Sequence, residues 1–131
     1  MAPHKLLTKA LREQLPELYA TEATPMAEKV AVAKFFTPDS NWTWYAVEFD
    51  HKDNDTFFGY VQGFENEFGY FSLSELQEAR GPLGLPIERD LSFKPTPLVE
   101  IDSRLKAKAE PNRQEGEEEE LEEDEELERS R

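Results

Sequence analysis

The side chains of this chain that could most readily take part in catalysis or metal binding are carboxylates, because the sequence has two histidines and no cysteine. The lack of cysteine excludes disulfides, thiol catalysis and Cys-based zinc sites. The segment DHKDND, Asp50 to Asp55, places His51 among three carboxylates, whose oxygens suit hard cations. Its spacing is not that of a calcium loop, since no glycine stands at the turn and no glutamate closes it. The other interpretation is a hairpin loop whose polar side chains face water.

Catalytic signatures are missing elsewhere in the sequence. There is no glycine-rich phosphate loop, no HExxH sequence and no Ser-His-Asp pattern. Any enzyme would have to depend on carboxylates, and the alternative we keep is a metal-dependent hydrolase or nuclease using Asp39, Asp50 or Asp53. The preferred prediction is a protein with no catalytic residue, no metal site and no cofactor.

Aromatic residues offer a different kind of site. The stretch FFTPDSNWTWYAVEFD, residues 35 to 50, holds six aromatic side chains around a Pro-Asp-Ser-Asn turn. Alternation along a strand predicts one face with Trp42, Trp44, Ala46 and Glu48, and another with Thr43, Tyr45, Val47 and Phe49. Aromatic side chains mostly build cores, but tryptophan and tyrosine also dominate protein interfaces. The stretch is therefore either core or a surface that binds a partner.

The segment RGPLGLPIERDL, residues 80 to 91, is a second candidate surface. It combines two glycines and two prolines with clustered charges. A rigid, charged loop can form a binding site, or it can be a buried connector whose ion pairs satisfy one another. From both segments together we predict a partner-binding surface that includes Trp42, Trp44, Asp39, Arg80 and Arg89.

Direct binding of nucleic acid is disfavoured by charge. Sheets that bind single strands combine stacking aromatics with a positive groove. Acidic residues outnumber basic ones near the predicted strands, and the whole chain has a formal net charge of −14. This balance does not favour the counterion release that drives phosphate binding. We therefore expect an unidentified protein partner and no membrane attachment.

These residues must be positioned by a small set of helices and strands. KLLTKALREQLPEL, residues 5–18, predicts an opening helix with Thr8 as N-cap that ends near Leu15, because Pro16 follows. Four runs rich in aromatic and β-branched residues predict strands at 29–36, 42–49, 56–64 and 69–73. The brief polar loops between them favour an antiparallel meander, since parallel crossovers need a dozen or more residues.

The chain after the fourth strand is predicted to be helical and then irregular. Capping-box spacing starts a second helix at Ser72 or Ser74, and Gly81 suits its C-terminal end. Four prolines between residues 82 and 97 predict an ordered but irregular stretch, with a short edge strand near 91–93.

The C-terminal residues form a low-complexity tail. From 110 to 131 there are twelve acids and three bases, a net charge of −9. Like charges at helical spacing repel one another, so disorder is expected. The fold class we predict is α+β: an antiparallel sheet of about four strands with two helices packed on one face. The predicted organisation is one globular domain, 1–105, followed by a disordered acidic tail, 106–131.

The compartment follows from what the sequence lacks. The N-terminus has no uninterrupted apolar run of the kind found in signal peptides. No segment approaches the roughly 20 apolar residues of a transmembrane helix. We therefore predict a cytoplasmic protein.

The run KFFTPDSNWTWYAVEFD, with DTFFGYVQGFENEFGYFSLSEL and RGPLGLPIERDL after it, resembles a known family. It is similar to small single-domain proteins, described as a domain of unknown function, that bacterial plasmids, phages and integrative elements carry. The similarity covers about residues 5–100. The family has no established catalytic residues, so none is transferred. The resemblance implies a bacterial or phage cytoplasmic setting and a role in mobile-element biology.

Two binding hypotheses follow. The leading one is a non-enzymatic protein-binding accessory factor of mobile-element biology. The alternative is an acidic decoy, whose tail mimics nucleic acid and occupies DNA- or RNA-binding proteins.

Overall fold

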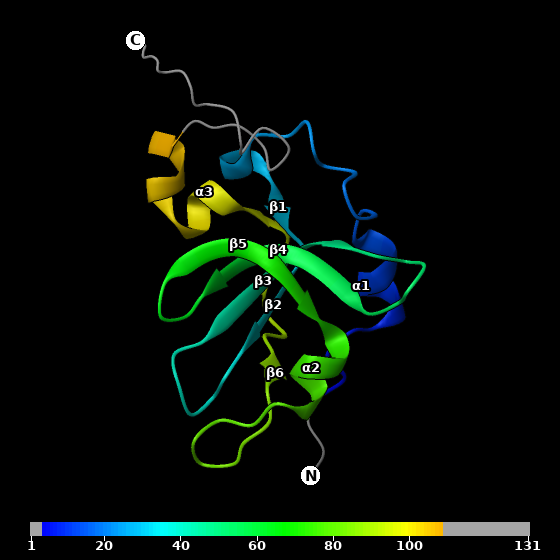
Figure 1. The fold of residues 1–131 in the computed structure, drawn as a ribbon, viewed down its shortest axis with the longest axis vertical. Coiled ribbons are helices and arrows are strands. Elements are labelled where there is room, and N and C mark those ends of the chain that lie inside the picture. Colours follow the sequence, from blue (N-terminus) through cyan, green and yellow to red (C-terminus); the bar gives the residue numbers. More distant parts are fainter. Residues whose placement is uncertain (1–3, 109–131) are drawn as a thin grey trace.

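The computed structural model describes residues 4–108, which form two antiparallel sheets with short helices around them (Figure 1). The larger sheet has five strands in the order β5-β4-β3-β2-β6. Its strands are β2 Ala33–Phe36, β3 Thr43–Phe49, β4 Thr56–Gln62, β5 Asn66–Ser72 and β6 Glu88–Arg89. The smaller sheet pairs β1 Val30–Ala31 with β7 Thr96–Pro97.

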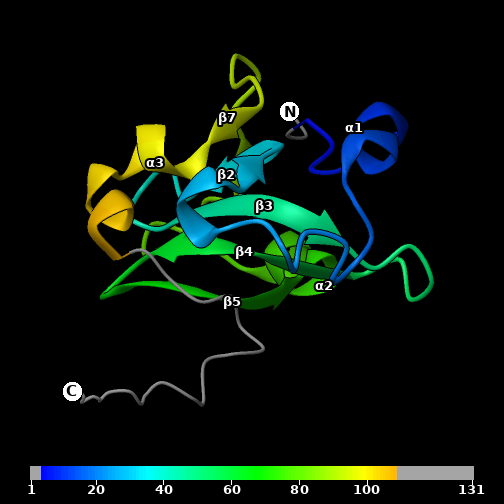
Figure 2. The same cartoon turned by 90° about the horizontal axis from the view of Figure 1, so that it is seen from above.

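The predicted antiparallel meander is confirmed, because β2, β3, β4 and β5 pair consecutively (Figure 2). The predicted number of about four strands is wrong, since β6 adds a fifth strand beside β2. In β6, Arg89 pairs with Phe35 and Glu88 with Phe36. Two residues are too short a strand to show alternating hydrophobicity, so the sequence pattern placed the edge strand at 91–93 instead.

Helix α1, Lys9–Gln14, begins and ends where the sequence predicts. The Thr8 hydroxyl oxygen accepts the backbone N–H of Leu11 at 3.1 Å, as an N-cap should. The helix ends at Leu15, directly before Pro16. The proline ring has no N–H to donate and clashes with the preceding turn, which stops the helix.

Helix α2, Leu73–Glu78, has Ser72 as N-cap, and the Ser72 hydroxyl accepts the N–H of Glu75 at 3.1 Å. The predicted helix end at Gly81 is wrong, because the C-cap is Ala79 in an extended conformation. Gly81 instead packs against a carboxylate, as described below. Three shorter elements complete the fold: η1 Met26–Glu28, α3 Leu98–Ile101 and η2 Ser103–Lys108.

A β-bulge in β3 decides which side chains face which side of the sheet. The register against β4 shifts between Ala46 and Glu48, after which Glu48 pairs with Phe58 and Phe49 with Phe57. Val47 keeps its predicted place with Tyr45, but the predicted alternation is wrong from Glu48 onward. Phe49 joins the cluster that holds Ala46, and Glu48 turns to the opposite face. An extra residue in a bulged strand has this effect because side chains alternate with a period of two.

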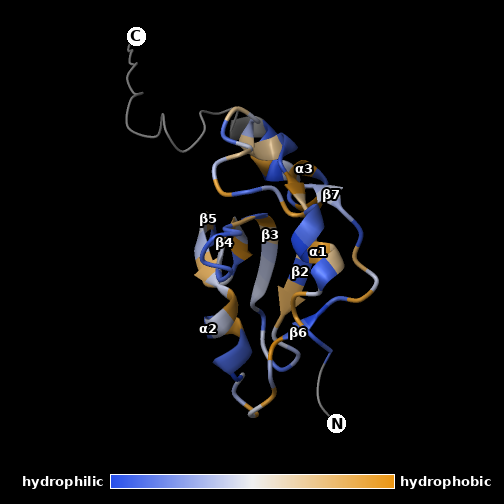
Figure 3. Cartoon of the chain, turned by 90° about the vertical axis from the view of Figure 1, so that its right-hand side faces the viewer, coloured by the Kyte–Doolittle hydropathy of each residue, from blue (hydrophilic) through white to orange (hydrophobic). Residues whose placement is uncertain are grey.

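Both faces of the larger sheet are covered. On one face, Leu15 beside α1 and Leu76 of α2 pack into one cluster with Phe35 and Phe57. Strand β2, much of it coloured as hydrophobic in Figure 3, lies between β3 and β6. On the other face, side chains of β3 and β4 pack against α3 and η2; the buried members are Ala31, Tyr45, Val47, Tyr60, Leu98 and Leu105.

Between residues 4 and 108, no helix combines the length and apolar character needed to cross a membrane. The predicted acidic tail, 106–131, lies outside the described residues except at its start.

Candidate functional site

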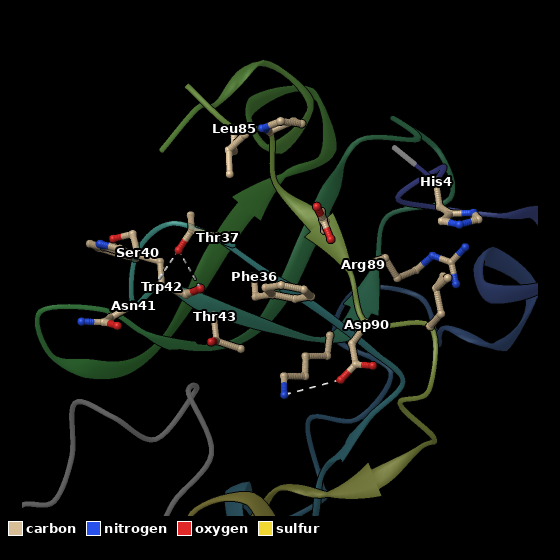
Figure 4. Close-up of a pocket in the computed structure, with 14 residues that line it drawn as sticks. His4, Phe36, Thr37, Ser40, Asn41, Trp42, Thr43, Leu85, Arg89 and Asp90 are labelled. Atoms are coloured by element: carbon tan, nitrogen blue, oxygen red, sulfur yellow. Dashed lines mark hydrogen bonds and ion pairs between the residues drawn. The ribbon is translucent and has the colours of Figure 1, made fainter. Parts of the chain in front are cut away.

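A depression of about 950 Å³ opens beside β2 and β6 (Figure 4). Its lining comes from the N-terminal segment, from β2, from the β2–β3 turn and from residues 85–91. Phe36 lies in the middle of this lining, next to its cross-strand partner Thr43. Two predicted partner-binding residues, Trp42 and Arg89, also line it. We call this depression the Trp42 cleft.

Charged groups in the Trp42 cleft balance one another. Lys34 and Arg89 provide two cations, and Glu88 and Asp90 provide two anions. The Lys34 ammonium lies 3.6 Å from the Asp90 carboxylate. Hydrogen bonds from Ser92 hold the pKa of Asp90 below its usual value, and Lys34 adds to this lowering. A lining with this balance has no net positive charge with which to bind a polyanion.

Trp42 is held firmly at the end of the sheet. Its indole stacks on that of Trp44, with ring centroids 5.9 Å apart and an interplanar angle of 25°. Phe64 meets it edge-on at 5.4 Å. A Cβ at Gly63 would come within 2.3 Å of the Trp42 indole, so the ring lies directly on the glycine backbone. The backbone N–H of Trp42 also donates to Thr37 Oγ1 at 3.0 Å.

The two tryptophans of the predicted surface have different environments. Trp44 packs against the core cluster that contains Phe35 and Phe57. Trp42 is partly exposed, and the Phe64 ring against it is 93% exposed. Both tryptophans are thus partly exposed, but Trp44 packs against the core cluster and Trp42 does not. A role of Trp42 in binding a partner stays a prediction.

Asp39 organises the loop that follows α2. Its Oδ2 accepts the N–H of Leu83 at 2.8 Å and that of Leu85 at 3.4 Å. Its Oδ1 is buried against Gly81, where an added Cβ would lie 1.7 Å away. The loop thus requires glycine at this position because the carboxylate fills the space of a side chain.

The two predicted arginines have separate contacts. The Arg80 guanidinium donates to the carbonyls of Gln77 at 3.2 Å and Ala79 at 2.7 Å, at the end of α2. Arg89 donates from Nε to the carbonyl of Lys5 at 2.9 Å, which ties the N-terminal segment to β6. Of the five predicted residues, the structure therefore brings Trp42 and Arg89 to one cleft, whereas Trp44 joins the core and the other two organise backbone.

Of the three carboxylates considered for metal chemistry, Asp39 lies apart from the other two, which share the loop after β3. Asp39 precedes β3 and Asp50 follows it, so the length of the strand separates them. Asp50 accepts the N–H groups of Lys52 and Asp53. Asp53 accepts the N–H and the hydroxyl of Thr56, and these bonds lower the pKa of Asp53. Within the described range, no three His, Asp or Glu side chains are grouped so that they could hold a metal ion.

The 50–55 loop is docked on α1. The Nε2 atom of His51 lies 3.0 Å from the carbonyl oxygen of Arg12. The Arg12 Nε donates to Asn54 Oδ1 at 2.7 Å, and the Glu17 carboxylate accepts the backbone N–H of His51 at 2.8 Å. Through these contacts His51 and its neighbours hold the 50–55 loop against α1.

The sequence analysis did not predict a buried polar cluster formed by Glu48, Lys29 and Thr21. Glu48 is 0% exposed and accepts the N–H of Tyr19 at 2.8 Å and that of Thr21 at 3.1 Å. Lys29 is 1% exposed and donates to the carbonyl of Thr21 and, at 3.0 Å, to its hydroxyl oxygen. The one available signal was a lone glutamate inside the apolar run YAVEF, since charged residues are seldom buried without partners.

A second cluster joins the C-terminal segment to the sheet. The Asp102 carboxylate accepts the Tyr60 hydroxyl at 2.6 Å and the Arg104 guanidinium at 2.8 and 2.9 Å. Hydrogen bonds from Arg104, and then from Tyr60, hold the pKa of Asp102 well below its usual range. Burial, with the hydrogen bond to Asp102, raises the pKa of Tyr60 to about 12. No local pattern links residues 42 positions apart, so the sequence gave no signal for this cluster.

Comparison with known proteins places the chain in a family. The family model described as "Protein of unknown function (DUF2958)" matches residues 6–113. No curated protein and no solved structure matches the chain. The predicted resemblance to a domain of unknown function is confirmed, while the mobile-element setting stays a prediction. The protein belongs to the DUF2958 family of proteins of unknown function.

Proposed function

We propose that this protein is a non-enzymatic accessory factor that binds a partner protein at the Trp42 cleft. The observation that carries the proposal is Phe64, which is 93% exposed and meets Trp42 edge-on at 5.4 Å. An exposed aromatic ring beside a partly exposed tryptophan loses contact with water only when another molecule covers it. Large aromatic side chains in such positions supply much of the binding energy of protein interfaces.

Other apolar side chains extend this surface. Leu85 is 43% exposed and Leu91 is 55% exposed, and both line the cleft with Phe36. The hydrogen bond from the Trp42 backbone to Thr37 fixes the turn that carries the indole. A fixed surface loses little conformational entropy when it binds, which favours affinity.

The charges of the cleft favour a protein over a nucleic acid. Two cations and two anions line it, so phosphate groups would meet no net positive charge. The candidate carboxylates Asp39 and Asp50 accept backbone N–H groups at opposite ends of β3, which supports binding over a reaction that needs them together. The decoy alternative depends on the tail, which lies beyond the described residues.

The resemblance to proteins of plasmids, phages and integrative elements sets the expected location. We expect the partner to be a protein of the bacterial host or of the element, met in the cytoplasm. A bacterial lysate is therefore the appropriate source of partners.

Capture from such a lysate tests the proposal. The immobilised full chain is compared with Phe64→Ser, whose ring lies outside the cleft lining but packs on Trp42, and with Leu83→Ser, since Leu83 is 79% exposed and neither lines the cleft nor packs a ring on Trp42. Because hot-spot aromatics contribute about 2 kcal/mol or more, Phe64→Ser should reduce capture of a specific protein by about tenfold or more. Leu83→Ser should leave capture unchanged.

Two results would refute docking at the Trp42 cleft: equal capture by Phe64→Ser, or no protein retained above background by the unaltered chain. A truncated chain that ends at residue 109 tests the decoy alternative, because it lacks the acidic residues 110–131. Capture that needs residues 110–131 and is lost to competing DNA in a salt-dependent manner would favour the decoy.

A further inference from the structure

We propose that the outer edge of β5 accepts an extended, basic segment of a partner protein as an additional antiparallel or parallel strand. This site is distinct from the Trp42 cleft, which lies beside β2 and β6 at the other edge of the sheet. It does not depend on the function proposed above.

Strand β5 is a long edge. Its seven residues, Asn66–Ser72, pair with β4 over their full length without a register shift. No described strand lies on its other side, and β5 is the outermost strand of the meander (Figure 2). The opposite edge, β6, has two residues, Glu88 and Arg89. A short edge offers little for another chain to pair with, whereas a long, regular edge is a template for strand addition.

Hydrogen bonds at the two ends of the β4–β5 hairpin fix the directions in which the backbone N–H and C=O groups of β5 point. Leu73 donates its N–H to Asp55, and Gly63 donates its N–H to Glu65. Backbone groups alternate between the two sides of an antiparallel strand. Odd-numbered residues of β5 therefore point their backbone groups toward β4, and even-numbered residues, beginning with Asn66, point them outward.

The edge carries few of the features with which proteins block strand addition, and Glu67 is the one charged side chain within Asn66–Ser72. The sequence NEFGYFS contains no proline, no lysine and no arginine. The β5 ladder has no bulge, and a Cβ placed on Gly69 would meet nothing within 4 Å. Natural edges are usually protected by lysine, proline, bulges or a covering segment.

An apolar groove of about 560 Å³ lies next to this edge. Its lining includes Met26, Phe58 and Phe68, together with Tyr70, which is 50% exposed. Phe68 and Tyr70 lie on the same face as Phe58, with ring centroids 6.1 and 5.2 Å from it. Alternate side chains of an added strand would lie over this face, so the groove suits apolar side chains at every second position.

Charge identifies the kind of segment that fits. From residue 62 to residue 79 there are four glutamates and no lysine or arginine. Glu67 is exposed on β5, on the face opposite Phe68, and Glu22 lines the groove. A second copy of the chain is disfavoured as the added strand, because it would place two such acidic edges together. The chain's own residues 110–131 are disfavoured because they carry a net charge of −9. An extended segment that alternates basic and apolar residues would lay its apolar side chains over the groove and its basic ones on the face of Glu67.

A synthetic peptide tests this site on the full chain. The probe is a capped nine-residue peptide that alternates lysine and valine, and the control peptide alternates glutamate and valine. NMR titration should show amide shifts concentrated in β5 for the lysine peptide and none for the glutamate peptide. Methylating the backbone nitrogens along one edge of the lysine peptide should abolish binding, because a strand pairs through these N–H groups.

A matched pair of variants tests the role of charge. Glu67→Lys should weaken binding of the lysine peptide by about five- to tenfold, because cross-strand attraction becomes repulsion. Glu78→Lys makes the same charge change on α2 and should alter the dissociation constant by less than about twofold. Circular dichroism of both variants checks that the sheet is intact.

Several outcomes would overturn the proposal. These are shifts outside β5, equal binding of the N-methylated peptide, equal effects of the two charge variants, or concentration-dependent self-association through β5. The last outcome would assign the edge to a second copy. Leu91→Ser, which alters the lining of the Trp42 cleft away from β5, should leave peptide binding intact, so a failure here is distinguishable from a failure at the Trp42 cleft.

Discussion

Replacing Glu48 with glutamine tests how much of the fold depends on one buried carboxylate. Glu48 lies at the bulge of β3 with no exposed surface, and it accepts two backbone N–H groups and the hydroxyl of Thr21. One of these N–H donors belongs to Tyr19, whose φ of 70° is uncommon for a residue with a side chain. Glu48 therefore holds the 19–21 segment in a conformation that it would seldom adopt alone.

The magnitude follows from the contacts that glutamine cannot make. The amide keeps one acceptor oxygen, and its NH2 group must face the N–H of Tyr19 or of Thr21, which are 2.8 and 3.1 Å from the two carboxylate oxygens. Losing one hydrogen bond to a charged acceptor costs about 1.5 to 3 kcal/mol. An unsatisfied buried N–H can raise the total to about 3 to 4 kcal/mol. In a domain of this size the melting temperature should fall by about 12 to 25 °C.

Urea denaturation followed by tryptophan fluorescence measures this loss. The matched control is Glu13→Gln, because Glu13 is exposed on α1, and it should change the free energy of unfolding by less than about 0.5 kcal/mol. A double-mutant cycle with Thr21→Val should give a coupling free energy of about 1 kcal/mol, since the two side chains share a hydrogen bond. A loss below about 1 kcal/mol for Glu48→Gln would refute the reasoning, because it would mean that water replaces the carboxylate at little cost.

Two further predictions concern strand packing and pH. Gly59→Ala should prevent stable folding or cost more than about 4 kcal/mol, because its Cβ would lie 1.9 Å from the carbonyl oxygen of Tyr45. Gly69→Ala, with nothing within 4 Å, is the control in the same urea assay, and equal losses would contradict this reading of the β3–β4 contact. The pKa of Tyr60 in the folded protein, about 12, lies above the ordinary tyrosine value of 10.0, so its contribution to stability is complete below pH 10 and is lost between pH 10 and 12. Alkaline unfolding curves should therefore be flatter over this range for Tyr60→Phe than for the unaltered chain, and identical slopes would count against the Asp102–Tyr60 contact.

Local signals predicted the starts of α1 and α2, the end of α1 and the meander correctly. Thr8 and Ser72 cap their helices through hydrogen bonds that span three residues, and Pro16 stops α1 through its own ring. Contacts of this range depend on residue type and spacing, which the sequence displays directly. The helix end at Gly81 was wrong because a tertiary contact with Asp39, not helix termination, requires glycine there.

The candidate site could be predicted only in part. Aromatic density singled out the region of Trp42, but the sequence could not separate it from Trp44, two positions away. The difference arises because Trp44 lies over the core cluster, whereas Trp42 lies beyond it against Gly63 and Phe64. Asp39 and Arg80 were selected for their charge, and the structure uses both to bind backbone groups.

The sequence by itself determined that the chain forms an α+β domain with an antiparallel meander, because hydrophobic alternation and short polar loops allow few other arrangements. Only the tertiary structure decided the bulge that turns Glu48 to the face opposite Phe49. It also decided the contact between Tyr60 and Asp102, and the position of β5 as the outermost strand within residues 4–108. These features depend on which distant segments meet, and that choice is made by packing and loop closure over the whole domain rather than by any local pattern.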